Sequence, residues 1–243
     1  MNSSESLPFA LDTSSEIPKF RAETFWTKEP ETIEWINRQL QTDTMIGLFI
    51  DVGANIGIYS LYASSVSSKV KIIAVEPVGQ NFMELEKNIL RNNKQDQITS
   101  FQMALSKISG KGILLNVDER LGSSGAQIQI SENGKSATTV VMTGDELLQK
   151  MNGIKLQNGL GVMLKVDTDG NELDVLRGFE VSFNNGQIHS VLIETHPSNR
   201  NGIEEFLLSK KLAEDKSYLE IEGHSDHRRE AKGNLERTKI YSI

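Results

Sequence analysis

The chain has 243 residues, no cysteine and a formal net charge of −7. The lack of cysteine excludes a thiol nucleophile, a Cys-ligated metal or iron–sulfur centre and a disulfide scaffold. A pI near 5.3 argues against binding to a phosphate backbone, so we expect no nucleic acid among the partners.

Membrane-crossing and targeting patterns are not seen in the sequence. No stretch approaches the roughly 20 apolar residues that span a bilayer, and the start MNSSESLPFALDTSSE has neither a basic region nor an apolar core like those of a signal peptide. We therefore expect a cytoplasmic protein with no membrane span.

The first part of the chain divides into a tail and a helical region. Residues 1–16 are rich in Ser, Asn, Asp and Glu, which predicts a disordered or loosely packed tail. After Pro30, the apolar residues Ile33, Ile36 and Leu40 recur at helical spacing. We expect residues 17–243 to form a single domain, with no linker that would divide it.

Strand and helix patterns then alternate along the chain. The expected strands are 47–53, 70–77, 98–105, 162–170, 190–197, 218–223 and 238–243, and the expected helices are 56–65, 81–93, 145–151, 172–179 and 203–212. Such alternation predicts an α/β fold with a doubly wound, Rossmann-like parallel sheet and helices on both faces. The last two strands have only a polar loop, 224–237, between them, which predicts an antiparallel partner at one edge.

The alternation is interrupted between the third and fourth strands. Residues 112–117 and 138–142 are strand-like, residues 121–130 form a Gly/Ser loop, and Asn133-Gly134 is a strong turn signal. The sequence therefore predicts a hairpin insertion. Its loop Gly122-Ser-Ser-Gly125 is either a lid over the acceptor or an ordinary hairpin loop.

The first strand ends in the glycine-containing turn Asp51-Val-Gly53-Ala-Asn55-Ile-Gly57, and Glu76 ends the second strand, 19 residues beyond Gly57. An acid about 20 residues after a glycine turn is placed to accept hydrogen bonds from ribose hydroxyls. This pattern indicates a ligand that contains a nucleoside.

The spacing of the glycines decides which nucleoside we expect. A dinucleotide turn has the pattern G-x-G-x-x-G, and here Gly53 and Gly57 stand four apart. The carboxylate of Asp51 would repel a diphosphate and attract a cationic tail, such as the ammonium group of S-adenosylmethionine. The alternative is that Asp51 and Asn55 only cap the following helix.

Together with these features, four blocks resemble class I S-adenosylmethionine-dependent methyltransferases of the FkbM family. The blocks are FIDVGANIGIYSL, AVEPVGQNFMELEKNI, LKVDTDGNELDVLRG and LIETH, in this order. The resemblance implies a seven-stranded sheet with the last strand antiparallel. It also implies methyl transfer to a hydroxyl oxygen, often of a sugar, a glycan or a natural product.

Carried over by position, the resemblance implies a set of residues around the cofactor S-adenosylmethionine. Those at the methionine and ribose parts are Asp51, Gly53, Ala54, Asn55, Gly57, Glu76, Pro77 and Asn81, and those near the adenine are Met103 and Ala104. Met103 is equally explained as a core residue.

Titratable groups also end the fourth and fifth strands. Asp167, His196 and Glu194 are the candidate catalytic residues, since a hydroxyl must lose its proton as it accepts a methyl group. His196 has the better reference pKa for a base, and Asp167 the better place in the motif. A divalent cation held by Asp167, Asp169 and Glu194 is a second possibility. The plain alternative is that Asp169 and Glu194 bind backbone groups, Lys165 or Arg177.

The leading hypothesis is thus an O-directed methyltransferase that acts on a small-molecule or glycan hydroxyl. A non-catalytic S-adenosylmethionine-binding homologue is the first alternative. A nucleotide-dependent oxidoreductase is the second, and both the glycine spacing and Asp51 argue against it.

Overall fold

The structure is a computed structural model, which describes residues 6–42, 45–118, 120–130, 138–151, 160–231, 233 and 235–243. Its centre is a seven-stranded sheet in the order β10-β11-β9-β8-β1-β2-β3. The strands are β1 (Ile46–Val52), β2 (Lys71–Val75), β3 (Ile98–Phe101), β8 (Gly161–Val166), β9 (Ile188–Thr195), β10 (Ala213–Glu214) and β11 (Arg237–Ser242). β11 runs antiparallel to β9 and β10, whereas β3, β2, β1, β8 and β9 are parallel. This confirms the predicted fold class, including the antiparallel last strand.

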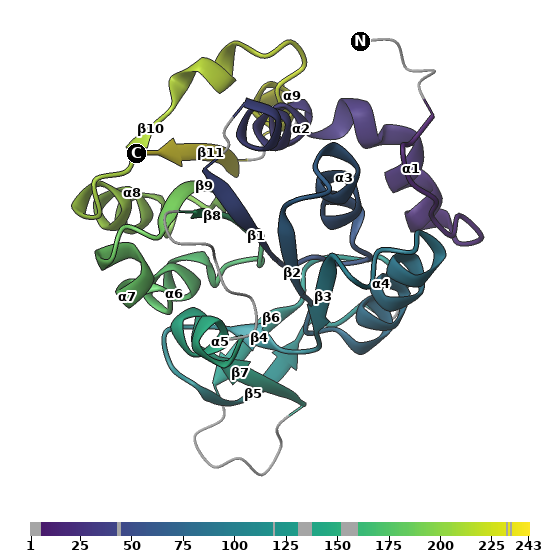
Figure 1. Cartoon of the computed structure of the whole chain (residues 1–243), viewed down its shortest axis with the longest axis horizontal. Coiled ribbons are helices and arrows are strands. Elements are labelled where there is room, and N and C mark those ends of the chain that lie inside the picture. Colours follow the sequence, from purple (N-terminus) through teal and green to yellow (C-terminus); the bar gives the residue numbers. More distant parts are fainter. Residues whose placement is uncertain are drawn as a thin grey trace.

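Helices cover both faces of this sheet (Figure 1). On one face are α1 (Glu16–Lys28), α2 (Pro30–Asn37), α3 (Ile58–Val66) and α4 (Gly79–Arg91), and on the other are α5 (Gly144–Lys150), α6 (Glu172–Arg177), α7 (Glu180–Asn184) and α8 (Arg200–Ser209). A π-helical turn, Arg38–Thr42, follows α2. Because helices cover both faces of the sheet, side chains that point to either face of a central strand are buried. All six residues of β8 are buried, and apart from Lys165 they form a continuous apolar run.

The predicted insertion forms a second, four-stranded sheet in the order β4-β7-β5-β6. Its strands are β4 (Ala104–Leu105), β5 (Gly110–Leu115), β6 (Gln127–Ile130) and β7 (Thr139–Met142). β5 pairs antiparallel with both β6 and β7, which confirms an antiparallel insertion. The strands on either side of Asn133-Gly134, β6 and β7, are not neighbours in the sheet, so the hairpin predicted from that turn was wrong. The expected third strand, however, is divided, because the chain leaves the main sheet after Phe101 and pairs with β7 from Ala104. The Asn133-Gly134 turn lies outside the described residues.

The prediction for the C-terminal part was wrong in two places. Residues 218–223 are not a strand: a 3-10 helix, Lys216–Glu220, occupies this region, and the short edge strand is β10. The expected polar loop contains a helix, α9 (Ser225–Ala231). It is held by Glu31, whose carboxylate accepts the Ser225 N–H at 3.1 Å from 194 positions away, a contact that no local pattern reveals.

Residues 6–15 lie against α4. The Ala10 N–H donates to Asn92 Oδ1 at 2.7 Å, and Leu7, Phe9 and Leu11 pack against the apolar cluster under α1 and α3. A polar composition alone predicted a loose tail, and these three apolar residues supply the contacts. Within the described part of the chain, no helix combines the length and the apolar character needed to cross a membrane.

Candidate functional site

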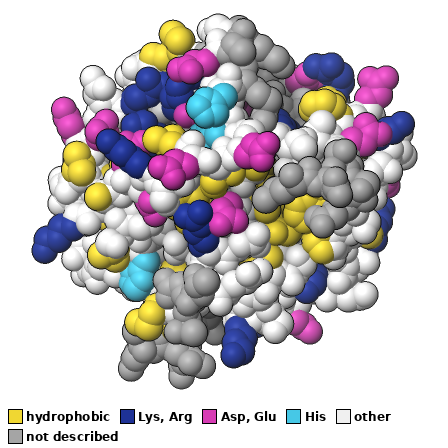
Figure 2. Space-filling model, turned by 90° about the horizontal axis from the view of Figure 1, so that it is seen from above, with side chains coloured by type: hydrophobic (Ala, Val, Ile, Leu, Met, Phe, Trp, Pro, Cys, Tyr) yellow, Lys and Arg dark blue, Asp and Glu magenta, His cyan; other side chains and the backbone are white. Residues whose placement is uncertain are grey.

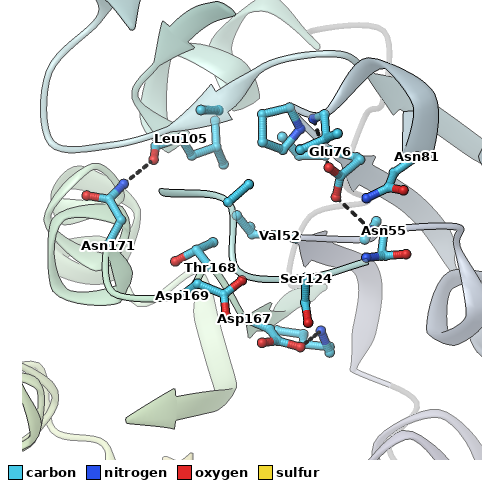
Figure 3. A pocket seen from close by; sticks show the side chains of 18 of the residues that line it. Val52, Asn55, Glu76, Asn81, Leu105, Ser124, Asp167, Thr168, Asp169 and Asn171 are labelled. Atoms are coloured by element: carbon cyan, nitrogen blue, oxygen red, sulfur yellow. Dashed lines mark hydrogen bonds and ion pairs between the residues drawn. The ribbon is translucent and has the colours of Figure 1, made fainter. Parts of the chain in front are cut away.

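A pocket opens where β1, β2 and β8 end at the carboxyl edge of the main sheet (Figure 3). It holds about 790 Å³ of space between atoms, a volume that includes solvent at its mouth. The predicted site residues among its lining are Gly53, Ala54, Asn55, Glu76, Pro77, Asn81, Met103, Ala104 and Asp167.

The turn after β1 is held tightly against both neighbouring strands. The N–H groups of Gly53 and Ala54 both donate to the carbonyl of Val75, at 2.9 and 3.0 Å. Gly53 has a φ of +79°, and a Cβ built there would stand 1.8 Å from the carbonyl oxygen of Asp167. Only glycine allows this approach, which brings the ends of β1, β2 and β8 together at the pocket floor.

Glu76 is fixed by the backbone on either side of it. Its two carboxylate oxygens accept the N–H groups of Asn55 and Val78, both at 2.8 Å. The side chain is 4% exposed, and burial raises the pKa of Glu76 to about 7 in spite of these two hydrogen bonds. Each carboxylate oxygen can accept a further hydrogen bond, so Glu76 can bind a pair of hydroxyls.

Next to Glu76 the pocket has an apolar wall. Val78, Met103, Leu105 and Ile128 line it, together with Ala104. The wall combines Val78, which precedes α4, with residues of the second sheet: Ala104 and Leu105 from β4 and Ile128 from β6. A flat, weakly polar ring would fit against such a surface.

The Gly/Ser loop of the insertion is tied down beside the pocket. The side-chain amides of Asn55 and Asn81 donate to the carbonyl of Ser123, at 2.7 and 3.1 Å, and Asn81 Oδ1 accepts the N–H of Gly122 at 2.8 Å. From the other side, Asp169 Oδ2 accepts the N–H of Gly125 at 2.8 Å. Ser123 and Ser124 line the pocket, so the loop is part of the site and not only a hairpin connection.

A buried lysine joins two of the predicted acids. Lys165 Nζ stands 3.4 Å from Asp51 Oδ1 and 3.2 Å from Asp167 Oδ2. Burial alone would lower the pKa of Lys165, but the charges of Asp167, Asp51 and Glu29 hold that pKa above its usual value. Burial raises the pKa of Asp167, but the charges of Lys165, Lys28 and Arg21 and the hydrogen bond from Lys165 together hold that pKa below its usual value. Asp167 is the more exposed of the two acids, at 36% against 1% for Asp51.

Asp51 itself lies behind the pocket lining. It pairs with Lys165 across β1 and β8, and its Oδ2 accepts the Ser60 hydroxyl at 2.7 Å. Gly57 also lies outside the lining, where a Cβ would stand 2.4 Å from Leu85 Cδ1. The space at Gly57 therefore serves the packing of α3 against α4.

The two strand-end groups of β9 do not line the pocket either. Glu194 makes an ion pair with Arg229 of α9. His196 has its Nδ1 3.4 Å from Glu236 Oε1, and its Nε2 is buried without a hydrogen-bond partner among the described residues. Neither residue lines the pocket, so Asp167 is the one predicted catalytic residue that the structure brings to it.

The described residues do not support the predicted cation site. They contain no group of three or more His, Asp and Glu placed to hold a metal ion. The carboxylates proposed as ligands are each engaged elsewhere: Asp167 by Lys165, Asp169 by the Gly125 N–H and Glu194 by Arg229.

Other residues of the pocket were missed by sequence reasoning. Tyr59 lines it, donates its hydroxyl to Glu29 Oε2 at 2.6 Å, and has its ring 5.3 Å from Lys165 Nζ. Lys165 could have been found from its position two residues before Asp167, which places both on one side of β8. Arg21 comes from α1, and no motif marks it.

Acidic and basic side chains are interspersed on the face of the molecule seen in Figure 2, with His side chains among them.

Comparison of the chain with known proteins identifies its family. The model of the methyltransferase FkbM domain family matches residues 51–229. The hexuronic acid methyltransferase AglP of Haloferax volcanii is 26% identical over 79% of this chain and 71% of its own length. Methyltransferase sdnD of Sordaria araneosa is 27% identical, and the match covers 54% of this chain and 60% of that protein. Among solved structures, a precorrin-6y C5,15-methyltransferase from Geobacter metallireducens has 12% identity and a TM-score of 0.45, with coverage of 85% and 78% of the two chains.

Proposed function

The chain belongs to the FkbM methyltransferase family, and from this premise we propose that it transfers a methyl group from S-adenosylmethionine to a hydroxyl oxygen of a sugar or natural product. The observation that carries this proposal is Glu76. A buried carboxylate, held by two backbone N–H groups beside the glycine turn, is suited to bind the two hydroxyls of a ribose.

The chemistry of the pocket fits the rest of the donor. The apolar wall of Met103, Leu105 and Ile128 suits the adenine ring. Asp167 lies on the opposite side of the pocket from Glu76 in Figure 3, and its ionised carboxylate suits a cationic sulfonium. Gly53, which also lines the pocket, contributes only backbone there.

We assign to Asp167 the role of the general base that removes the proton of the acceptor hydroxyl. When bound, S-adenosylmethionine supplies a methyl group on a positively charged sulfur, and the acceptor oxygen forms its bond to carbon as the carbon–sulfur bond breaks. Asp167 takes the proton that the acceptor oxygen gives up. Lys165 positions Asp167 and keeps it ionised, while Asp51 anchors Lys165 from behind. General-base assistance of this kind contributes about 10²–10⁴-fold in rate.

The acceptor class rests on the relatives. One relative is named for hexuronic acid, and we infer a related hydroxylated, carboxylate-bearing sugar as the first acceptor to test.

The experiment has a binding step and a turnover step. Calorimetry should detect S-adenosylhomocysteine binding to the wild-type protein, and a screen of glycans with radiolabelled S-adenosylmethionine should detect methyl transfer. Asp167→Asn should reduce kcat by about 10²-fold or more while leaving the affinity for S-adenosylhomocysteine within a few-fold. His196→Gln is the matched control and should retain turnover, because His196 lies outside the pocket.

Each failure has its own meaning. Binding of NADH without any response to S-adenosylhomocysteine would overturn the methyltransferase proposal. Loss of turnover in His196→Gln but not in Asp167→Asn would overturn the assignment of the base. Tight S-adenosylhomocysteine binding with no methyl transfer to any acceptor would favour a non-catalytic binding protein.

A further inference from the structure

Arg21 extends from α1 into the pocket, far in sequence from every motif that predicts the site. Its Nε donates to the carbonyl of Gly122 at 2.9 Å. Among the described residues, no carboxylate makes an ion pair with it and no other hydrogen bond to its guanidinium is found. An arginine has five N–H donors, so most of the donors of this half-buried side chain are left for a ligand.

The other charged side chains of the pocket already have ion-pair or hydrogen-bond partners. Lys165, the second cation of the lining, has Asp51 and Asp167 as partners. Glu76 accepts two backbone N–H groups, and Asp169 accepts that of Gly125. Of the two cations in the described lining, Lys165 is in contact with carboxylates and Arg21 is not.

The position of Arg21 relative to the acids is also informative. Burial is the largest influence on the pKa of Glu76 and on that of Asp167, and it acts to raise each of them. The positive charge of Arg21 is among the influences that act to lower each of them. Arg21 is thus close enough to both ends of the pocket to act on each, without bonding to either. Its Nε is held by Gly122, so the two Nη groups form the remaining edge.

We propose that this edge of Arg21 binds a carboxylate group of a ligand in the pocket. A guanidinium binds a carboxylate with two parallel N–H···O bonds, which gives both charge and orientation. The inference rests on the proposed function, which offers two sources of a carboxylate: the amino-acid end of the donor, and an acidic sugar acceptor.

The contact with Gly122 gives the binding a second consequence. Gly122 belongs to the Gly/Ser loop, and a Cβ on it would stand 3.3 Å from Ile17 of α1. A carboxylate bound by Arg21 would therefore connect α1, the loop and the ligand.

The test compares ligands that differ in the carboxylate. Calorimetry would measure S-adenosylhomocysteine and 5′-methylthioadenosine, which keeps the thioadenosine and lacks the amino-acid part, on the wild type, Arg21→Met and Arg21→Lys. Decarboxylated S-adenosylmethionine, which keeps the ammonium group, isolates the carboxylate. Lys19→Met removes the same charge from an exposed position of α1 and is the matched control.

If the carboxylate is that of the donor, Arg21→Met should weaken S-adenosylhomocysteine binding by a factor of about 10–100. Binding of 5′-methylthioadenosine and of the decarboxylated analogue should be unchanged, and Arg21→Lys should lie between. If the carboxylate is that of the acceptor, S-adenosylhomocysteine binding stays constant. Binding of glucuronate, measured with saturating S-adenosylhomocysteine, should then fall in Arg21→Met, whereas binding of glucose should not.

Two results would overturn the proposal. One is an equal loss for S-adenosylhomocysteine and 5′-methylthioadenosine, which would indicate a structural role for Arg21. The other is a carboxylate preference that is identical in the wild type and Arg21→Met for both donor and acceptor. A failure of the proposed function is distinguishable, because the wild type itself would then not bind S-adenosylhomocysteine.

Discussion

Glu76 shows how a residue can be identified from sequence while its chemistry depends on the fold. Its distance from the glycine turn predicts a place at the end of the second strand. Its raised pKa follows from burial at the pocket floor, which the two N–H groups of Asn55 and Val78 do not fully offset. The pKa of about 7 makes the charge of this carboxyl sensitive to pH near neutrality.

We expect the affinity for S-adenosylhomocysteine to rise with pH through this pKa. Hydroxyl donors favour the ionised carboxylate, so the ligand selects the deprotonated form, and binding releases a proton. Between pH 6 and 8 the affinity should increase by about tenfold. Calorimetry in buffers of different ionisation enthalpy measures both the affinity and the proton released.

Glu76→Gln is the control for this prediction. It keeps the size of the side chain and cannot titrate, so its affinity should be lower and should not change with pH. A wild-type affinity that is flat over the same range would contradict the role of Glu76.

Asp51 and Asp167 show that the sequence around a single residue does not decide whether its side chain lines the pocket. Each stands at the end of a predicted strand, shortly before a glycine, and the sequence makes both equally plausible pocket residues. The structure separates them: Lys165 makes an ion pair with each, but Asp51 is buried outside the pocket lining, whereas Asp167 is part of it. Glu194 and His196 were misplaced for a related reason, since their partners Arg229 and Glu236 come from the distant C-terminal region.

At the scale of elements, the turn after β1 is the most constrained part of the site. Gly53 needs both a positive φ and the absence of a Cβ, because the Asp167 carbonyl would be 1.8 Å from it. The backbone of this turn cannot move without separating β1 from β8.

We therefore expect Gly53→Ala to reduce the free energy of unfolding by about 3 kcal/mol or more. Gly186→Ala is the matched control: Gly186 has a φ of +66°, and no atom lies within 4 Å of a Cβ built there. It should show the backbone strain alone, about 1–2 kcal/mol. Urea unfolding measures both, and equal losses would show that the close approach at Gly53 is not tight.

The elements that could be predicted were those with strong periodic patterns. The central strands are apolar on both faces, and the helices between them carry apolar stripes. The α9 helix could not be predicted in this way, because its contact with Glu31 is made across the whole length of the chain.

At the scale of the whole molecule, the pocket is built from distant parts of the chain. α1, the turn after β1, the Gly/Ser loop and the end of β8 each supply part of its lining. A ligand that contacts all of them stabilises the folded state over the unfolded one.

S-adenosylhomocysteine should therefore raise the melting temperature. At a concentration 100 times its Kd, the stabilisation is about 2.7 kcal/mol, which corresponds to about 5–10 °C for a chain of this size. Differential scanning calorimetry with and without the ligand measures this shift. NADH should give no shift, and a shift with NADH alone would support the oxidoreductase alternative.

The sequence by itself determined the alternation of the central parallel strands with helices, the family, and the part of the pocket that lies on the turn after β1 and at the end of β2. Those features are local: they depend on periodicity and on short motifs that hold their residues within one connection. Only the tertiary structure decided that Asp167 enters the pocket while Asp51, Glu194 and His196 do not, and that Arg21 and Ser123 join it. These placements depend on ion pairs and hydrogen bonds between residues far apart in the chain, such as Arg21 with Gly122, and burial fixes them only once the elements have packed.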